Sequence, residues 1–198
     1  WYLSTDCQDE ELKPNSIPYT SAINACAYAF SGPTPKKSEA TILESKQAAF
    51  ETAKSIFESC DQIGALDHIT YSTMLIACQN LLPNSTTERS SAVEWIMEHC
   101  IWNGHVSVIV LTELKKVLRN DNFLFHKLLR GHAKHIQTRI APSYKRNNRA
   151  KKGGGRCNGG NNNKGRLELL VDMNDFPQEW SREVRVNRRN RRNTRHSS

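Results

Sequence analysis

Cysteine and histidine are the residue types in this chain that could bind a metal ion or supply a nucleophile. The six cysteines form no Cys-x-x-Cys pair, and that pair is the half-site on which structural zinc sites are usually built. His132 and His135 lie three positions apart, but no carboxylate or thiol accompanies them. We therefore expect no metal and no other cofactor, and we interpret the cysteines as reduced core thiols in a reducing compartment.

The sequence also lacks the short motifs that carry catalytic chemistry. It contains no Gly-x-x-x-x-Gly-Lys phosphate loop, no His-Glu-x-x-His zinc motif and no Gly-x-Ser-x-Gly nucleophile turn. The glycines at residues 153–155 precede Arg156, but no strand is expected before them and no helix after them, so they do not form a phosphate cradle. We predict that the chain is not an enzyme.

Arginine is concentrated at the C-terminal end, where phosphate binding is the chemistry that it could perform. Residues 182–195 contain seven arginines, among them Arg188, Arg189, Arg191 and Arg192. Guanidinium groups in such a run contact phosphates without reading a base sequence, and their binding weakens steeply as salt is added. A sorting signal is the alternative interpretation of the same run.

Charge divides the chain into two parts. Residues 1–140 hold 13 Lys and Arg against 15 Asp and Glu, a net charge of −2, whereas residues 141–198 hold 15 against 5, a net charge of +10. The second part is rich in Gly, Asn and Arg, so we expect a disordered basic tail. Within it, residues 166–184 form a short segment expected to dock on the preceding domain, where Trp180 either packs or stacks on a base. The asymmetry predicts a polyanionic partner, either nucleic acid or an acidic membrane surface.

The strongest pattern in the sequence is an internal repeat. Residues 17–26 align without a gap on residues 69–78, and both segments begin with Ile and end with Ala-Cys. Residues 56–64 align in the same way on residues 96–104, with cysteine and glycine at the same separation. Such repetition indicates two-helix units whose apolar faces are buried by their neighbours. We therefore predict an all-α fold, a short α-solenoid of helix-turn-helix repeats.

The elements that build these units follow from hydrophobic periodicity and from helix-capping residues. Helices are predicted at residues 16–30, 40–60, 69–81, 86–102, 106–118 and 122–138. The β-branched start of the fifth could form a buried strand, but its alignment with the earlier units favours a helix. The repeat domain then covers residues 15–140, in units of about 16–67, 68–107 and 108–140, with an insertion in the first unit. Residues 1–14 are interpreted as the end of a preceding repeat or as a linker.

The segment Ile-Thr-Tyr-Ser-Thr-Met-Leu at residues 69–75 resembles the opening of the repeat of pentatricopeptide repeat proteins, and the resemblance covers roughly residues 15–118. It implies a chain that is the C-terminal part of a longer array and binds single-stranded RNA, one base per unit. It also implies a role in RNA stability, processing or translation in a mitochondrion or chloroplast.

The resemblance further implies which residues contact the bases. In the family, the fifth residue of the first helix and the last residue of the unit set the choice of base. These positions are Thr20 with Asp67 and Ser72 with Ser107, and Thr112 is the fifth residue of the third unit. A Thr and Asp pair is associated with guanine, although Asp67 would also serve as a plain helix N-cap. The second residues of the helices would sandwich the bases: Ile17, Ile69 and Ile109.

Two other functions stay open at this point. Ala53 and Phe57 have a spacing shared with tetratricopeptide repeats, which bind peptides, so the same groove could make the chain a protein-binding scaffold. A ribosome-associated protein whose tail follows ribosomal RNA is the third interpretation. No apolar run of about 18 residues is present, so no membrane span is predicted.

Overall fold

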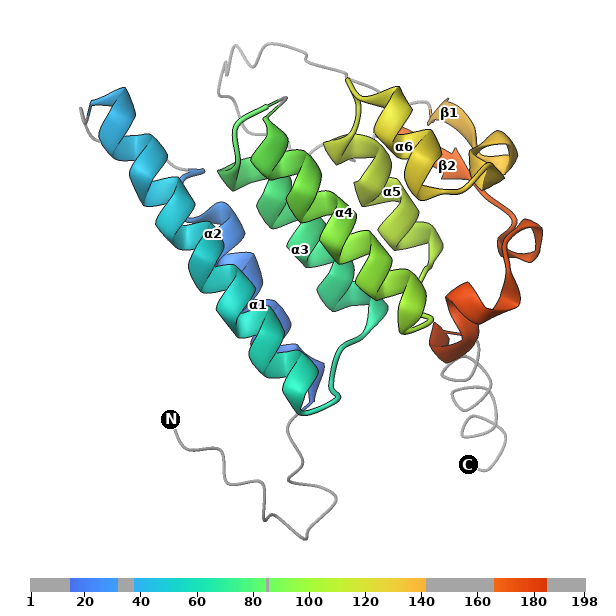
Figure 1. Cartoon of the computed structure of the whole chain (residues 1–198), viewed down its shortest axis with the longest axis horizontal. Helices are drawn as coiled ribbons and strands as arrows, with labels where there is room; N and C mark the ends of the chain where they lie inside the picture. Colours follow the sequence, from blue (N-terminus) through green and yellow to red (C-terminus); the bar gives the residue numbers. More distant parts are fainter. Residues whose placement is uncertain (1–14, 32–37, 85, 142–165, 185–198) are drawn as a thin grey trace, which may run out of the picture.

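The computed structural model describes residues 15–31, 38–84, 86–141 and 166–184, and these residues are mostly helical (Figure 1). The helices are α1 (Ser16–Tyr28), α2 (Glu39–Gln62), α3 (His68–Leu81), α4 (Thr87–Trp102), α5 (Val108–Val117) and α6 (Asn122–Leu128). Shorter elements follow: η2 (His132–His135), β1 (Gln137–Ala141), β2 (Arg166–Leu170), η3 (Met173–Asp175) and η4 (Gln178–Ser181). Among the described helices, none combines the length and the apolar character that crossing a bilayer requires.

The helices α1, α3 and α5 begin at equivalent residues because an equivalent cap precedes each of them. Asn15, Asp67 and Ser107 stand in extended backbone immediately before the helix. The side chain of Asn15 accepts a hydrogen bond from an N–H two residues on, and those of Asp67 and Ser107 accept from the N–H three residues on. Such caps satisfy amides that have no partner inside the helix. The cap residues therefore determine at which residue the first helix of each unit begins.

The helices α2 and α4 end in the same glycine turn. Gly64 and Gly104 have φ values of 65° and 73°, in the left-handed region that a Cβ atom disfavours. In both turns the residue after the glycine donates its N–H to a cysteine carbonyl five positions earlier, and the glycine donates to the carbonyl three positions earlier. This pair of bonds is the Schellman motif, which satisfies the last carbonyls of a helix. The aligned Cys and Gly of the two repeats thus serve the same turn.

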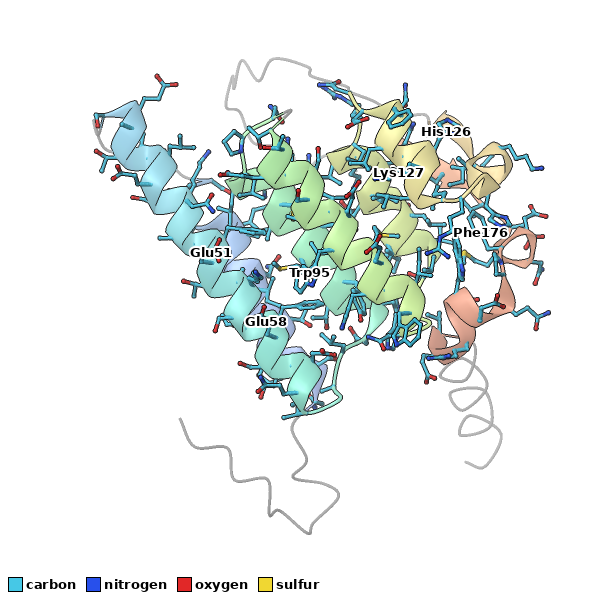
Figure 2. The ribbon with its side chains drawn as sticks, in the orientation of Figure 1. Glu51, Glu58, Trp95, His126, Lys127 and Phe176 are labelled. Carbon is cyan, nitrogen blue, oxygen red and sulfur yellow. The ribbon has the colours of Figure 1, made fainter. Side chains whose placement is uncertain are left out.

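The helices lie in two layers. α1 contacts α3 and α3 contacts α5, while α2 packs over α1 and α3, and α4 packs over α3 and beside α6. In Figure 1, α1 and α3 lie behind α2 and α4. The core between the layers contains Phe57 of α2, whose ring centroid is 5.4 Å from that of Tyr71 and 5.5 Å from that of Trp95. Figure 2 shows Trp95 on the side of α4 that faces α2. The prediction of a helical domain is confirmed for the described residues.

The last predicted helix of this domain is wrong beyond Leu128. The helix expected over residues 122–138 ends at Leu128, because Arg130 and Gly131 adopt φ values of 47° and 85°, which are incompatible with a continuing helix. The chain then forms η2 and β1, and β1 pairs antiparallel with β2. The described part of the chain is therefore mostly helical, with one two-stranded sheet beside α5.

The segment after β2 packs against the end of α4. The N–H of Val106 donates to the carbonyl oxygen of Trp180 at 2.7 Å, and the N–H of Glu183 donates to the carbonyl oxygen of Gly104 at 3.2 Å. Trp180 is 5% exposed, and its ring lies 6.0 Å from that of Phe176, which is labelled in Figure 2. Trp180 thus packs on the helical region, which was one of the two roles that the sequence suggested for it.

Candidate nucleic-acid interface

Three isoleucines stand at the second position of α1, α3 and α5, and all three are exposed. Ile17 is 67% exposed, Ile69 38% and Ile109 45%. Aliphatic side chains of this size favour burial by about 1.5–3 kcal/mol, yet Ile17 keeps most of its surface in solvent, and Ile69 and Ile109 keep more than a third of theirs. The residues predicted to sandwich bases therefore lie at the surface, at equivalent helix positions.

Hydroxyl and amide groups hold α1 and α3 side by side in parallel. At the N-terminal ends, the Ser16 hydroxyl donates to Oδ2 of Asp67 at 2.8 Å, and the Oγ1 atoms of Thr20 and Thr70 lie 2.9 Å apart. At the other end, the side-chain amide of Asn80 in α3 donates to a backbone carbonyl of α1 at 3.2 Å. The bonded residues are 50, 51 and 53 positions apart, so corresponding turns of the two helices lie next to each other.

Asp67 is the centre of the polar contacts at these N-terminal ends. Its Oδ1 accepts from the Thr70 N–H at 2.8 Å and from the Thr70 hydroxyl at 2.9 Å, while Oδ2 accepts from Ser16. Burial alone would raise the pKa of this carboxyl, but the hydrogen bonds from Thr70 and Ser16 outweigh burial and lower the pKa below 3.8. Asp67 is therefore a carboxylate at neutral pH, and Thr70 connects it to Thr20.

The other predicted base-reading residues lie at different depths. Ser72 and Ser107 are each 4% exposed. The Ser72 hydroxyl donates to a carbonyl of its own helix at 2.8 Å, and the Ser107 hydroxyl caps α5. Thr112 is half-buried, and its hydroxyl donates to a carbonyl of α5 at 2.7 Å. The structure thus brings Thr20 and Asp67 together near the surface and places Ser72 and Ser107 inside.

We use the name isoleucine face for the surface formed by Ile17, Ile69 and Ile109 together with Thr20 and Asp67. Adjacent packed helices are about 8–10 Å apart, a separation at which a flat ring can lie between the isoleucines of successive helices. The edge of such a ring could reach Thr20 and Asp67, which carry one hydroxyl and one carboxylate. The arrangement can therefore combine apolar contact with hydrogen bonding to a planar ligand.

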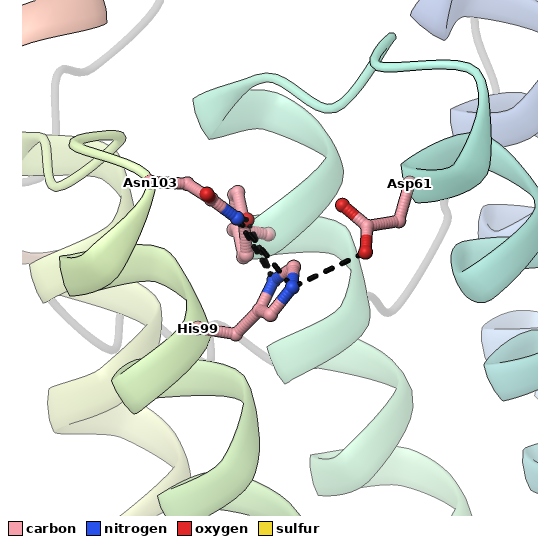
Figure 3. Close-up of polar contacts among 4 residues, drawn as sticks. Asp61, His99 and Asn103 are labelled. Carbon is pink, nitrogen blue, oxygen red and sulfur yellow. Dashed lines mark hydrogen bonds and ion pairs between the residues drawn. The ribbon is translucent and has the colours of Figure 1, made fainter.

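A polar network behind this face connects α2, α3 and α4 (Figure 3). The Tyr71 hydroxyl lies 2.9 Å from Nδ1 of His99 and accepts from the amide of Asn103 at 3.1 Å. Nε2 of His99 lies 3.2 Å from Oδ2 of Asp61. Tyr71 is fully buried, and burial raises the pKa of its phenol, so it stays protonated. This network fixes the position of α3 beneath the exposed isoleucines.

Sequence reasoning missed the contribution of Ser16 and Thr70. Thr70 is the third residue after the cap Asp67, and its backbone N–H is the group that an N-cap side chain normally accepts from. The hydrogen bond from the Thr70 hydroxyl to the Asp67 carboxylate could therefore have been expected from the sequence. The bond from Ser16 joins residues 51 positions apart, so it depends on the packing of α1 against α3 and has no local signal.

Several predictions lie outside this face. Arg188, Arg189, Arg191 and Arg192, the residues predicted to bind phosphate, fall outside the described residues. Within the described ranges, no group of three or more His, Cys, Asp or Glu side chains could hold a metal ion. Comparison of the chain with family models, curated proteins and solved structures finds no match. A function for this chain therefore has to be inferred from its own residues.

Proposed function

We propose that the isoleucine face binds single-stranded RNA, with one base beside each of the helices α1, α3 and α5, as in a short solenoid of pentatricopeptide-like repeats. The observation that carries this proposal is the exposure of Ile17, Ile69 and Ile109 at the same position of three adjacent helices. Unstacked bases offer two apolar faces, and proteins that bind single strands commonly cover those faces with side chains.

The polar groups beside the isoleucines suit the edge of a base. A carboxylate has about four lone-pair sites, and Asp67 uses two on Oδ1 and one on Oδ2. The remaining site on Oδ2 can accept a hydrogen bond from guanine, whose ring N–H and amino group are both donors. Thr20 adds a hydroxyl that it shares with Thr70. We therefore assign a preference for guanine to the first unit, while Thr112 makes the corresponding contact in the third.

The residues one helical turn beyond the predicted base-reading positions favour RNA over a peptide as the ligand. Four residues after Thr20, Ser72 and Thr112, the helices hold Asn24, Ile76 and Lys116. The amide of Asn24 and the ammonium group of Lys116 are separated by Ile76 on the middle helix, and Lys116 is paired with Glu113 at 2.6 Å, whereas capture of a peptide carboxylate would need such donors together and available. The row of isoleucines, in contrast, is uniform. A protein-binding scaffold of the tetratricopeptide kind is therefore the second candidate.

The expected affinity of the face alone is modest. Stacking contributes roughly 1–3 kcal/mol per base, so three bases give a weak complex once the cost of ordering the strand is included. The arginines at positions 188, 189, 191 and 192 would add phosphate contacts that do not depend on base sequence. In this proposal the chain acts on organellar RNA, where it would affect stability, processing or translation.

The test is the binding of the full chain to short RNA oligomers that differ by one guanine, measured by fluorescence anisotropy at near-physiological salt. We expect Ile69→Ser to weaken binding by about tenfold, because a base loses an apolar contact worth ~1–3 kcal/mol. The matched control is Leu43→Ser, which removes an exposed aliphatic side chain from α2 in the other layer. Asp67→Asn should remove the preference for guanine.

Two results would contradict the proposal. One is equal affinity for Ile69→Ser and Leu43→Ser, which would mean that the isoleucine face does not contact RNA. The other is identical binding to every oligomer in the wild-type chain, which would attribute binding to the basic residues alone. Either result would make the peptide-binding scaffold the leading candidate.

A further inference from the structure

A second feature of the molecule is a groove at the opposite ends of the helices from the isoleucine face. It lies between the turn that joins α3 to α4 and the turn that joins α5 to α6, which are both at the upper edge of Figure 1. Its volume is about 1160 Å³. The basic residues that line it are Arg89, Lys115, Lys116 and Arg119. None of these four residues belongs to a motif of the sequence.

Arg89 is a buried cation without a carboxylate partner among the described residues. It is only 6% exposed, and its two terminal nitrogens donate to the backbone oxygen of Gln79 and to the side-chain oxygen of Asn84. Its Nε is buried and has no hydrogen-bond partner in the described part of the chain. Burial lowers the pKa of this guanidinium. Buried charges are costly unless an opposite charge or further hydrogen bonds accompany them.

The acidic residues in the lining are engaged elsewhere. Glu94 pairs with Lys127 at 2.6 Å, and Asp121 accepts from a backbone N–H as the cap of α6. Arg119 is exposed and forms no ion pair within the described ranges. The groove therefore presents more available positive charge than negative charge.

The first turn of α4 adds to this polarity. Arg89 is the third residue of α4, a helix of 16 residues whose cap is Thr86. The N-terminal end of a helix carries a partial positive charge and favours anions. Hydroxyl groups of Thr87, Ser90 and Ser91 also line the groove. They are donors that phosphate oxygens accept from, and they share the lining of the groove with Arg89, whose Nε has no partner among the described residues.

We propose that this groove binds phosphate groups, with Nε of Arg89 as the central donor and Arg119 at its rim; Lys116 is paired with Glu113 at 2.6 Å and is not counted as a ligand. Guanidinium groups match the geometry of phosphate oxygens and frequently bind them with two hydrogen bonds. A purely structural role for Arg89, bracing the turn between α3 and α4, accounts for its bonds to Gln79 and Asn84. It leaves the buried Nε unexplained.

The first experiment uses the full chain and inorganic pyrophosphate. A buried Arg Nε–H exchanges slowly enough with water to give its own NMR signal, and we expect pyrophosphate to shift the Arg89 signal in a saturable way. Arg119→Gln should weaken this binding about fivefold. Lys134→Gln is the matched control, because it removes an exposed charge that does not line the groove. Arg89→Lys keeps the charge, removes the Nε donor and should abolish the effect.

The second experiment separates two sources of phosphate, a free ligand and the backbone of an RNA strand. With an RNA oligomer, each lost phosphate contact reduces the slope of log affinity against log salt by about 0.7. We expect that reduction for Arg119→Gln and not for Lys134→Gln if the strand extends into the groove. Pyrophosphate binding without any change in slope would identify a free phosphorylated ligand. The proposal is overturned if pyrophosphate leaves the Arg89 signal in place and Arg119→Gln and Lys134→Gln have the same RNA slope.

The pyrophosphate experiment is independent of the proposed function, whereas the salt slope rests on RNA binding by the chain. Weaker RNA binding by Ile69→Ser tests the isoleucine face, whereas the Arg89 signal and the salt slope test the groove. Arg119 is exposed two residues beyond the end of α5, so Arg119→Gln is expected to fold even if Arg89→Lys does not.

Discussion

The turns at Gly64 and Gly104 share one backbone conformation and differ in their surroundings. Both have positive φ, end a second helix and lead into a capped first helix. A Cβ atom on Gly64 would have no described atom within 4 Å, whereas one on Gly104 would lie 2.9 Å from the backbone oxygen of Glu179 and 2.5 Å from Cγ of Arg182. The local sequence thus determines the conformation of both turns, and tertiary contacts give the turn at Gly104 a second role.

That second role is the attachment of the segment after β2. The carbonyl oxygen of Gly104 accepts from the N–H of Glu183, and the carbonyl oxygen of Trp102 accepts from Nη2 of Arg182 at 3.1 Å. The absence of a side chain at Gly104 lets the two backbones approach. Two repeat units with the same turn sequence can therefore have different roles, because another segment of the chain packs on one of them and not on the other.

The largest effect is expected from removing the side chain that anchors this segment. Trp180→Ala should lower the free energy of unfolding by ~3–5 kcal/mol, because it empties a large buried volume. Trp102→Ala, which truncates a ring that is 80% exposed, should change it by no more than about 0.5 kcal/mol. Urea unfolding of both variants measures the difference. Equal effects would mean that the segment after β2 does not stabilise the covered turn.

The next largest effect compares the two glycines directly. Gly64→Ala should cost ~1–2 kcal/mol, the penalty of a Cβ atom in the left-handed region. Gly104→Ala adds the close approach to Glu179 and Arg182, and we expect about twice that cost because overpacking adds ~1–3 kcal/mol. Urea unfolding again provides the comparison. The interpretation is wrong if Gly64→Ala is the more destabilising of the two.

A smaller difference is expected between the caps that follow the two turns. Asp67→Ala and Ser107→Ala should each cost about 1 kcal/mol for the lost cap, and Asp67→Ala more because Ser16 and the Thr70 hydroxyl also lose their acceptor. The two caps should also differ in pH dependence. The folded state lowers the pKa of Asp67 below 3.8, so its contribution is complete above about pH 4 and is lost as pH falls through the folded pKa.

The measurement for this pair is the free energy of unfolding at neutral pH and in acid. The difference between wild type and Asp67→Asn should shrink as pH falls below about 4, since the wild-type carboxyl becomes protonated. The difference between wild type and Ser107→Ala should stay constant, because a hydroxyl does not titrate in this range. A constant difference for Asp67→Asn would contradict the assigned role of its carboxylate.

The smallest effect is expected at Asp61, which has no equivalent acid in the second repeat. Its partner His99 belongs to the network of Figure 3, but the Asp61 side chain is 44% exposed. Exposed ion pairs contribute ~0–1 kcal/mol, so Asp61→Asn should lower the free energy of unfolding by no more than about 0.5 kcal/mol. Thermal unfolding would detect a larger loss, and such a loss would show that the network depends on this charge.

The helices and turns were predictable where the repeat supplied independent copies of the same signal. The helix starts predicted at positions 16 and 69 lie within one residue of the observed ones, while the start predicted at 106 lies two residues before Val108, because Ser107 was not recognised as a cap. The β-branched segment there was assigned correctly as a helix only through the alignment. The strand β1 was not predicted. Its partner β2 lies beyond a long insertion, and the stop signal Gly131 was overlooked in favour of the apolar periodicity.

The isoleucine face and the groove around Arg89 also differ in how far the sequence could predict them. The resemblance to pentatricopeptide repeats pointed to Ile17, Ile69 and Ile109, and their contact with bases stays a prediction. The depth of Ser72 and Ser107 was not predicted, since it depends on how α1 and α5 cover α3. The groove around Arg89 joins two turns that are remote in sequence. Arg89 itself looks like an ordinary polar residue of a first helical turn, so no local pattern marks its burial.

The cysteines at equivalent repeat positions give the molecule a set of internal reporters. α1 to α4 contain one cysteine each, and burial raises the pKa of the Cys60 thiol to about 11 and that of Cys78 to about 12. Only the thiolate reacts with alkylating reagents, so these thiols are protected until their helix opens. Cys26 is more accessible than the others. The order in which the four sulfurs are alkylated would therefore record, helix by helix, how this domain comes apart.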